Sequence, residues 1–329
     1  MKTKYAFIVL LMLYALVSQR ASAQDFHLTQ YDMSPMYINP ALTGIYLGEK
    51  GDFRAMANYR SQWQKLQGKP FTTAAFAFDK PIKRFGVGAY LMDNIAGKSN
   101  YNTTNLVVGC AYIITSEASK EHYLTTGIQL GIINKKFGQD DLLFTTQYNN
   151  TSGFNASADN GEGFEKYSIL RFDSNFGIYY KYRNPDKKIN PFIGLSVYHV
   201  NRPNQAVTGT MSRTPMRFNI NGGAIITIND IVKLQPSFLY MYQGKAQEAD
   251  ITLTSYYHMK ETSFDLIAAV SCRLQDSFAF HFGIKQGASM YRISYDFVTS
   301  PLKAYSGSRG GVELGVIYTG FKRVTKAKI

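Results

Sequence analysis

Polar and apolar residues alternate in short segments along most of this chain. Residues 291–297 read YRISYDF, so an aromatic or aliphatic side chain takes every second position, and Arg292, Ser294 and Asp296 take the positions between. Successive side chains of a β-strand point to opposite faces, so the pattern predicts strands with one apolar and one polar face. A soluble sheet buries its apolar face in a core, whereas a membrane barrel turns that face to lipid and its polar face to a lumen.

The alternation predicts about fourteen strands of roughly ten residues, the length with which a tilted strand spans an outer membrane. The expected ranges are 52–62, 70–79, 84–93, 101–114, 121–134, 168–182, 189–200, 216–228, 231–243, 249–259, 262–273, 276–286, 288–298 and 310–321. After the N-terminal segment no apolar stretch is long enough for a transmembrane helix, so insertion into a membrane would be by a closed barrel. We therefore expect an all-β fold, a transmembrane antiparallel outer-membrane β-barrel over residues 52–321.

The lengths of the expected connections support this fold. The three longest connections all follow odd-numbered strands: 135–167, 201–215 and 299–309. Connections after even-numbered strands include the shorter 80–83, 183–188, 229–230 and 260–261. Bacterial barrels have short periplasmic turns and long outer loops, whereas a soluble sandwich gives no reason for such sorting.

The two ends of the chain differ from the predicted barrel. Residues 1–23 have the features of a cleaved secretory signal: basic Lys2 and Lys4, an apolar run over 6–17, and Ala-Ser-Ala at 21–23. We expect the mature chain to start at Gln24 and to reach the cell outer membrane. Residues 24–51 form a periplasmic or plug segment, and residues 322–329 form a basic tail.

The charge of the chain is strongly positive. The net charge is +13, and removal of segment 1–23, with its three basic and no acidic residues, leaves +10. Nucleic acid is one partner that such a charge can indicate, but an exported chain without a recognition motif does not favour it. Many of the basic residues fall in expected turns, where they would meet acidic proteins or the anionic headgroups of outer-membrane lipid.

Charged residues also occur on the expected polar faces of the strands. They are Arg54, Arg60, Asp173, Lys181, Asp265, Arg273, Lys285, Arg292, Asp296 and Glu313. They could brace the wall as a paired network or form a charge-selective pore, and we favour the network because buried charges in closed sheets tend to pair. Glycines inside strands would permit tight packing in the lumen. Cys110 and Cys272 continue apolar faces and are interpreted as small hydrophobic residues without a disulfide.

No catalytic or metal-binding motif is present, so no enzyme activity, metal or cofactor is expected. The five histidines are scattered along the chain. His258 and His281 both fall on the expected lumen face, where a Ser-His hydrolase could be built, but the sequence selects no particular serine.

The segment before the first strand has a different character. Pro35 and Pro40 restrict the backbone, Asn39-Pro40 favours a turn, and Gly44 can adopt a positive φ. We interpret residues 27–44 as neither strand nor helix. This segment could plug the lumen or dock a periplasmic partner; the alternative is a linker into the barrel.

The same segment carries a resemblance to a known family. It is similar to a Q-Y-x-x-x-P-x-x-x-N-P-A-x-x-G signature, matched by Gln30, Tyr31, Pro35, Asn39, Pro40, Ala41 and Gly44. A Y-R-x-Q-W element follows, with Tyr59, Arg60, Gln62 and Trp63. These motifs resemble the PorP/SprF outer-membrane proteins of the Bacteroidetes type IX secretion and gliding machinery. Two positions depart from the pattern: Thr252 stands in place of Asn, and Val312 in place of His.

The resemblance implies a non-enzymatic barrel that acts through protein partners. Family members join the translocation apparatus with periplasmic ring components, or help to export and attach a surface adhesin that carries a type B C-terminal signal. The signature residues are then candidates for partner docking or for the plug, and Trp63 could equally anchor the barrel at the membrane interface. The alternative function is an outer-membrane diffusion channel or solute transporter, which the charged lumen face would suit; a membrane hydrolase is the third possibility.

Overall fold

A computed structural model describes most of the chain between residues 25 and 321. The described residues are 25–46, 51–64, 70–97, 101–116, 118–119, 121–136, 144–149, 151, 153–155, 157–158, 161, 168–206 and 211–321. The expected signal segment 1–23 and basic tail 322–329 lie outside the described residues.

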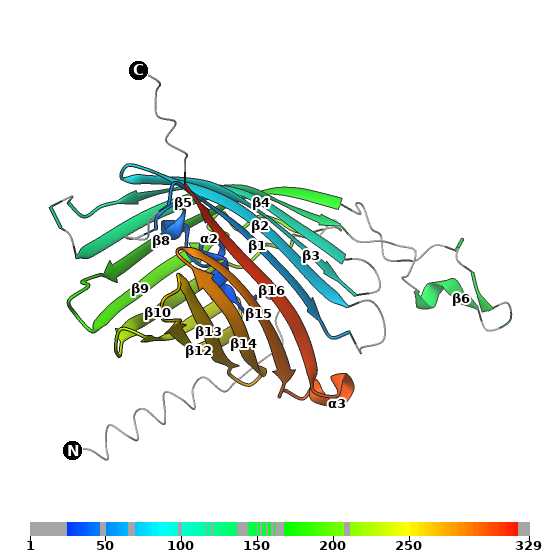
Figure 1. Cartoon of the computed structure of the whole chain (residues 1–329). Coiled ribbons are helices and arrows are strands. Elements are labelled where there is room, and N and C mark those ends of the chain that lie inside the picture. Colours follow the sequence, from blue (N-terminus) through cyan, green and yellow to red (C-terminus); the bar gives the residue numbers. More distant parts are fainter. Residues whose placement is uncertain are drawn as a thin grey trace, which may run out of the picture.

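Fourteen antiparallel strands in the described chain close into one barrel (Figure 1). They are β1 (Phe53–Gln62), β2 (Phe71–Ile82), β3 (Phe85–Ala96), β4 (Tyr101–Ile113), β5 (His122–Lys136), β8 (Ser168–Tyr182), β9 (Ile189–Tyr198), β10 (Arg217–Thr227), β11 (Val232–Gln243), β12 (Ala246–His258), β13 (Phe264–Arg273), β14 (Ser277–Gln286), β15 (Ser289–Val298) and β16 (Arg309–Gly320). The predicted fold and strand number are confirmed, and no strand boundary differs by more than three residues from its expected position.

Each strand pairs with its neighbours along the chain, and the first and last strands complete the ring. β1 pairs with β16 in a register that places Arg60 opposite Glu313. A closed barrel leaves no unpaired strand edge, which is the condition for placing β-structure in lipid. None of the described helices is long and apolar enough to cross a membrane.

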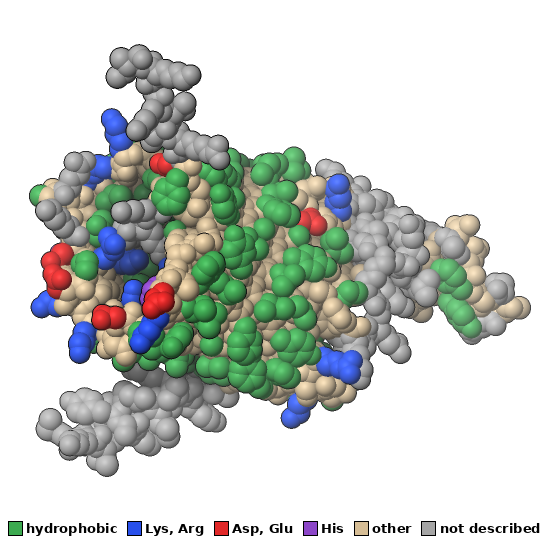
Figure 2. Space-filling model, viewed as in Figure 1, with side chains coloured by type: hydrophobic (Ala, Val, Ile, Leu, Met, Phe, Trp, Pro, Cys, Tyr) green, Lys and Arg blue, Asp and Glu red, His purple; other side chains and the backbone are tan. Residues whose placement is uncertain are grey.

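The two faces of the wall have opposite polarity. Outward positions carry exposed apolar side chains, such as Phe280, Phe282 and Ile293. Figure 2 shows many hydrophobic side chains across the outer surface of the wall. Inward positions on the same strands are buried and polar, such as His281 and Ser294. This is the inside-out distribution of a barrel whose solvent is lipid. Cys110 and Cys272 are free and lie on the separate strands β4 and β13, as expected.

The three longest connections share one end of the barrel, as predicted. The three long connections follow β5, β9 and β15 and therefore lie at one end of the barrel, here called the long-loop end. The first contains the short strands β6 (Tyr148–Asn149) and β7 (Gly153–Phe154), and the third contains α3 (Lys303–Ser306). The opposite end, here called the short-turn end, has tight connections such as Lys83-Arg84 between β2 and β3.

Candidate functional site

Residues 25–46, here called the plug, lie inside the barrel. At the start of the plug, the Asp25 amide donates to Gln243 Oε1 at the long-loop end of β11. Near its end, Gly44 donates to Asp79 Oδ2 beside the short-turn end of β2. The plug therefore crosses the lumen from the long-loop end to the short-turn end before the chain enters β1 (Figure 1).

The plug consists of three short helical turns. They are η1 (Tyr31–Met33), α2 (Pro35–Ile38) and η2 (Pro40–Leu42). Pro35 and Pro40 each open a turn, where proline's missing N–H and fixed φ cost nothing. Asn39 Oδ1 caps the third turn by accepting from the Ala41 amide at 2.9 Å. The expectation that this segment is not helical is therefore wrong, because two prolines at first helical positions start turns rather than prevent them.

His199 holds the beginning of the plug at the long-loop end. Its Nε2 lies 2.7 Å from Asp25 Oδ2, and its Nδ1 lies 2.8 Å from Asp173 Oδ1 on β8. Burial alone would lower the pKa of His199, but the carboxylates of Asp25 and Asp173 raise that pKa to about 9. Burial would raise the pKa of Asp25, but His199 and Arg217 hold it far below its usual range. A charged imidazolium thus joins the plug to the wall at neutral pH.

Arg217, the first residue of β10, holds the same part of the plug. It donates to Asp25 Oδ2 at 3.0 Å and to the Tyr37 hydroxyl at 2.7 Å. Its guanidinium also stacks between the rings of Tyr37 and Tyr198, at 4.6 and 4.2 Å from the ring centroids. A planar guanidinium suits this place because it stacks and donates at the same time.

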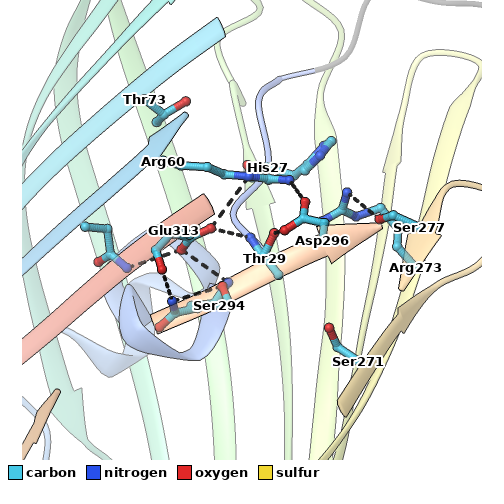
Figure 3. Close-up of polar contacts among 12 residues, drawn as sticks. His27, Thr29, Arg60, Thr73, Ser271, Arg273, Ser277, Ser294, Asp296 and Glu313 are labelled. Atoms are coloured by element: carbon cyan, nitrogen blue, oxygen red, sulfur yellow. Dashed lines mark hydrogen bonds and ion pairs between the residues drawn. The ribbon is translucent and has the colours of Figure 1, made fainter. Parts of the chain in front are cut away.

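Residues 27–30 of the plug are bound to the wall at the seam between β1 and β16 (Figure 3). The carboxylate of Glu313 accepts from the amides of Thr29 and Gln30, at 2.7 and 3.2 Å. Arg60 pairs with Asp296 and donates to the His27 carbonyl at 2.7 Å. A carboxylate oxygen of Glu313 lies 3.7 Å from the Nε atom of Arg60. All these side chains are buried, so the ion pairs and plug bonds depend on one another.

A bulge in the wall directs Asp296 into this network. The register between β15 and β16 shifts beside Asp296, where Gly310 and Gly311 supply the additional backbone of β16. A Cβ at Gly310 would lie 2.6 Å from the Asp296 carbonyl oxygen, so only glycine fits there. Bulges commonly re-aim a side chain in this way.

A further ion pair holds the first turn of the plug. Arg292 on β15 lies 2.5 Å from Asp32 Oδ1, and its Nε lies 3.2 Å from Gln30 Oε1. Gln30 also donates to the Glu313 carbonyl and to Ser294 Oγ. The predicted network of lumen charges is therefore present among these residues, and it binds the plug as well as the wall.

Asn39 and Pro40 pack directly against glycines in the wall. Asn39 Nδ2 donates to the carbonyls of Ile178 and Leu195 on β8 and β9. A Cβ at Gly177 would lie 2.1 Å from Asn39 Oδ1, and a Cβ at Gly127 would lie 2.3 Å from the Pro40 carbonyl oxygen. The expectation that interior glycines permit tight packing in the lumen is confirmed at these positions.

The end of the plug is fixed at the short-turn end. Asp79 accepts from the Gly44 amide and pairs with Arg54 at 2.5 Å. Gly44 has φ +59°, and a Cβ there would lie 2.8 Å from Gly86 Cα. Its positive φ and the close approach of β3 both require glycine at this position.

The structure brings most of the residues named from the sequence into the lumen. Gln30, Tyr31, Asn39, Pro40, Ala41 and Arg60 are buried in or against the plug; Pro35 starts α2, and Gly44 ends the packed region. Gln62 and Trp63 lie at the long-loop end of β1, next to a cavity. Tyr59 does not join them, because it points outward with half of its surface exposed.

Sequence reasoning missed four residues that hold the plug: Asp25, His199, Arg217 and Asp79. His199 and Arg217 flank one of the long connections, and Asp25 follows the expected cleavage site, so no local pattern joins them. Alternation along β2 would have placed Asp79 on the polar face, together with Thr73 and Ala75.

The site offers no complete catalytic arrangement. Ser271 Oγ lies 2.9 Å from His281 Nε2, but His281 Nδ1 has no hydrogen-bond partner among the described residues, so the carboxylate of a triad is lacking there. The described residues hold no cluster of His, Cys, Asp and Glu that could bind a metal.

Comparisons with known proteins give a matching family and solved structures with a similar fold. The model of the family "Type IX secretion system membrane protein PorP/SprF" matches residues 20–318. A solved structure titled "CymD monoaromatic hydrocarbon channel" has a TM-score of 0.52 and 11% identity, over 88% of this chain and 93% of the other. One titled "TodX deltaS2S3 mutant monoaromatic hydrocarbon channel" has a TM-score of 0.51 and 11% identity, over 86% and 92%. These identities show a shared outer-membrane barrel fold alone. No curated protein matches.

Proposed function

Because the chain belongs to the PorP/SprF family of type IX secretion system membrane proteins, we propose that it is a non-enzymatic barrel of the cell outer membrane that supports export or surface attachment of a secreted protein. It acts through protein–protein contacts. Its partners are periplasmic ring components of the secretion system, a surface adhesin with a type B C-terminal signal, or both.

The observation that carries this proposal is the plug. A diffusion channel needs a continuous path, and here buried wall residues bind the plug inside the lumen: Arg60, Asp296 and Glu313 through hydrogen bonds, and Arg292 through an ion pair with Asp32. Removal of one buried partner, such as Arg60, leaves an uncompensated buried charge and costs roughly 3 to 5 kcal/mol. A barrel filled in this way suits a rigid membrane anchor for other proteins better than it suits a pore.

The two ends of such an anchor would have different partners. Long loops of bacterial barrels face the outside and short turns face the periplasm. The long-loop end would then receive the secreted protein, and the short-turn end, where Asp79 fixes Gly44, would face the ring components.

Deletion of the gene, followed by proteomics of the cell surface and culture fluid, tests the proposal. We expect loss of one large surface protein if the barrel serves a dedicated partner, and loss of many secreted proteins if it belongs to the core apparatus. An unchanged set of secreted and surface proteins in the deletion strain would refute the proposal.

A double substitution Asn39→Ala and Pro40→Ala tests the plug itself. It removes the bonds to the Ile178 and Leu195 carbonyls and the start of η2. Export should fall while the amount of folded barrel in the membrane stays normal. Outward-facing Phe282→Ala is the matched control. Normal export by the double variant at normal protein levels would show that the plug has no part in docking.

The second candidate function is a diffusion channel, which the charged side chains on the lumen face, such as Arg60, Arg292 and Asp296, would suit. Conductance of the purified barrel in planar bilayers separates the two functions. We expect no stable conductance from the intact chain and a large one after excision of residues 25–44. A steady conductance through the intact barrel, together with an unchanged secretome in the deletion strain, would support the channel.

A further inference from the structure

A large cavity lies at the long-loop end, above the beginning of the plug. Its volume is about 850 Å³, and its floor includes His27, Glu248 and Arg273. Concave sites of roughly 300 to 1,000 Å³ are the size that proteins use for small ligands. The cavity is therefore large enough for a ligand of a few sugar rings, but it is small for a protein–protein interface.

Most charged side chains around the cavity are paired with an opposite charge. Glu248 lies between His27 at 3.1 Å and Arg273 at 3.4 Å, and Arg273 also pairs with Asp276 at 2.8 Å. Asp25 is held by His199 and Arg217, whereas Lys135 donates to the neutral amide of Gln205. A neutral polar ligand would suit such a lining, and it would avoid the cost of stripping water from an ion.

Amide side chains dominate the rest of the polar lining. They are Gln62, Asn94, Asn105, Gln205, Gln247 and Gln275. An amide both donates and accepts, as a sugar hydroxyl does, so the two groups match without any charge. The Oδ1 atom of Asn105 is buried and has no hydrogen-bond partner among the described residues. Such an acceptor costs free energy until a donor reaches it, and a ligand hydroxyl would satisfy it.

Aromatic rings form the apolar part of the lining. Trp63, Phe71 and Tyr101 all border the cavity, and Trp63 packs edge-on against Phe71 with 4.9 Å between centroids. Trp63 also has φ +53°, a backbone conformation that is rare for a bulky residue and is found where surrounding structure enforces it. Flat aromatic faces can cover the C–H face of a sugar ring.

We propose that this cavity is a binding site for a neutral oligosaccharide. The proposal is independent of the secretion role. A peptide is the less favoured occupant because an extended peptide usually adds to a free strand edge. All fourteen strands of the described barrel are paired on both sides. The neutral sugar could come from the polysaccharide of a lipopolysaccharide or from a free oligosaccharide, which share the same chemistry.

The test begins with the purified full-length barrel in lipid nanodiscs free of lipopolysaccharide, applied to an array of neutral and acidic glycans and neutral peptides. Because Trp63 is the sole tryptophan, its fluorescence then reports occupancy during titration with neutral trisaccharides of glucose, mannose and galactose. We expect a saturable shift with at least one neutral glycan. Lipopolysaccharide that carries a neutral O-polysaccharide should compete when it is added to the nanodisc if the membrane polysaccharide is the source, and should have no effect if the ligand is a free oligosaccharide.

Two variants keep the test specific. Asn105→Leu and Phe71→Ala should each weaken binding at least tenfold, while Gln286→Ala, an exposed amide at the short-turn end, should bind as the unmodified chain does. Folding of every variant is checked by heat-dependent mobility in gels. Absence of binding to every neutral glycan at about 10 mM, or saturable binding of peptides alone, would overturn the proposal. Binding by the two cavity variants with the affinity of the unmodified chain would also overturn it.

Discussion

Arg60 and Glu313 face each other on the first and last strands of the barrel, and their side chains meet inside the lumen. The same two residues bind the plug through the His27 carbonyl and the amides of Thr29 and Gln30. Closure of the wall and retention of the plug therefore depend on one shared set of contacts.

Replacing Arg60 by Ala should destabilise both the closed wall and the bound plug. The change leaves Asp296 and Glu313 buried without their counter-ion, so we expect a loss of roughly 3 to 5 kcal/mol in the free energy of unfolding. Urea unfolding of the barrel in detergent micelles measures the loss. The matched control is Arg309→Ala, an exposed residue of β16, which should unfold at the original urea concentration. Equal stability of the two variants would show that the seam network contributes nothing.

Adding a methyl group at Gly127 should push the plug away from the wall. A Cβ at this position meets the Pro40 backbone, which cannot yield as a flexible side chain does. We expect Gly127→Ala to cost about 1 to 3 kcal/mol and to raise amide exchange in residues 39–44. Gly222→Ala on the outer face of β10, where the added Cβ first meets the Phe238 ring, is the control and should leave exchange in the plug unchanged.

The attachment of Asp25 should depend on pH. The raised pKa of His199 means that its contribution is complete below about pH 6.5 and is lost as pH rises through about 9. The depressed pKa of Asp25 means that its contribution is present above about pH 4 and is lost as pH falls below that value. Protection of the amides of residues 25–30, measured relative to the intrinsic exchange rate at each pH, should therefore be greatest between these limits. His199→Gln should remove the fall in protection on the alkaline side; a fall that persists in this variant would assign it to another group.

Tyr59 should be dispensable for the plug, although it is adjacent to Arg60 in the sequence. It points outward, so Tyr59→Ala should leave both conductance and plug exchange as they are in the unmodified chain. Conductance through the Tyr59→Ala barrel would show that this outward side chain helps to hold the plug in the lumen.

The strands were predictable because their signal is local. Each needs only the alternation of neighbouring residues, as in 291–297, and the length of the adjoining connection. The position of the plug was not predictable to the same degree, because its contacts join residues far apart in sequence, such as Thr29 with Glu313 and Asp25 with His199. The helical turns did have a local signal, since Ser34-Pro35 and Asn39-Pro40 each place a polar residue before a first-turn proline.

The threading of the plug also has a consequence for biogenesis. The plug precedes β1, so it is synthesised before every strand of the barrel, yet its partner Glu313 lies on β16, the last of these strands. A chain that ends before β16 would have neither a closed wall nor the carboxylate that receives Thr29 and Gln30. The contacts of Thr29 and Gln30 with Glu313 can therefore form only after the last strand of the barrel has been made.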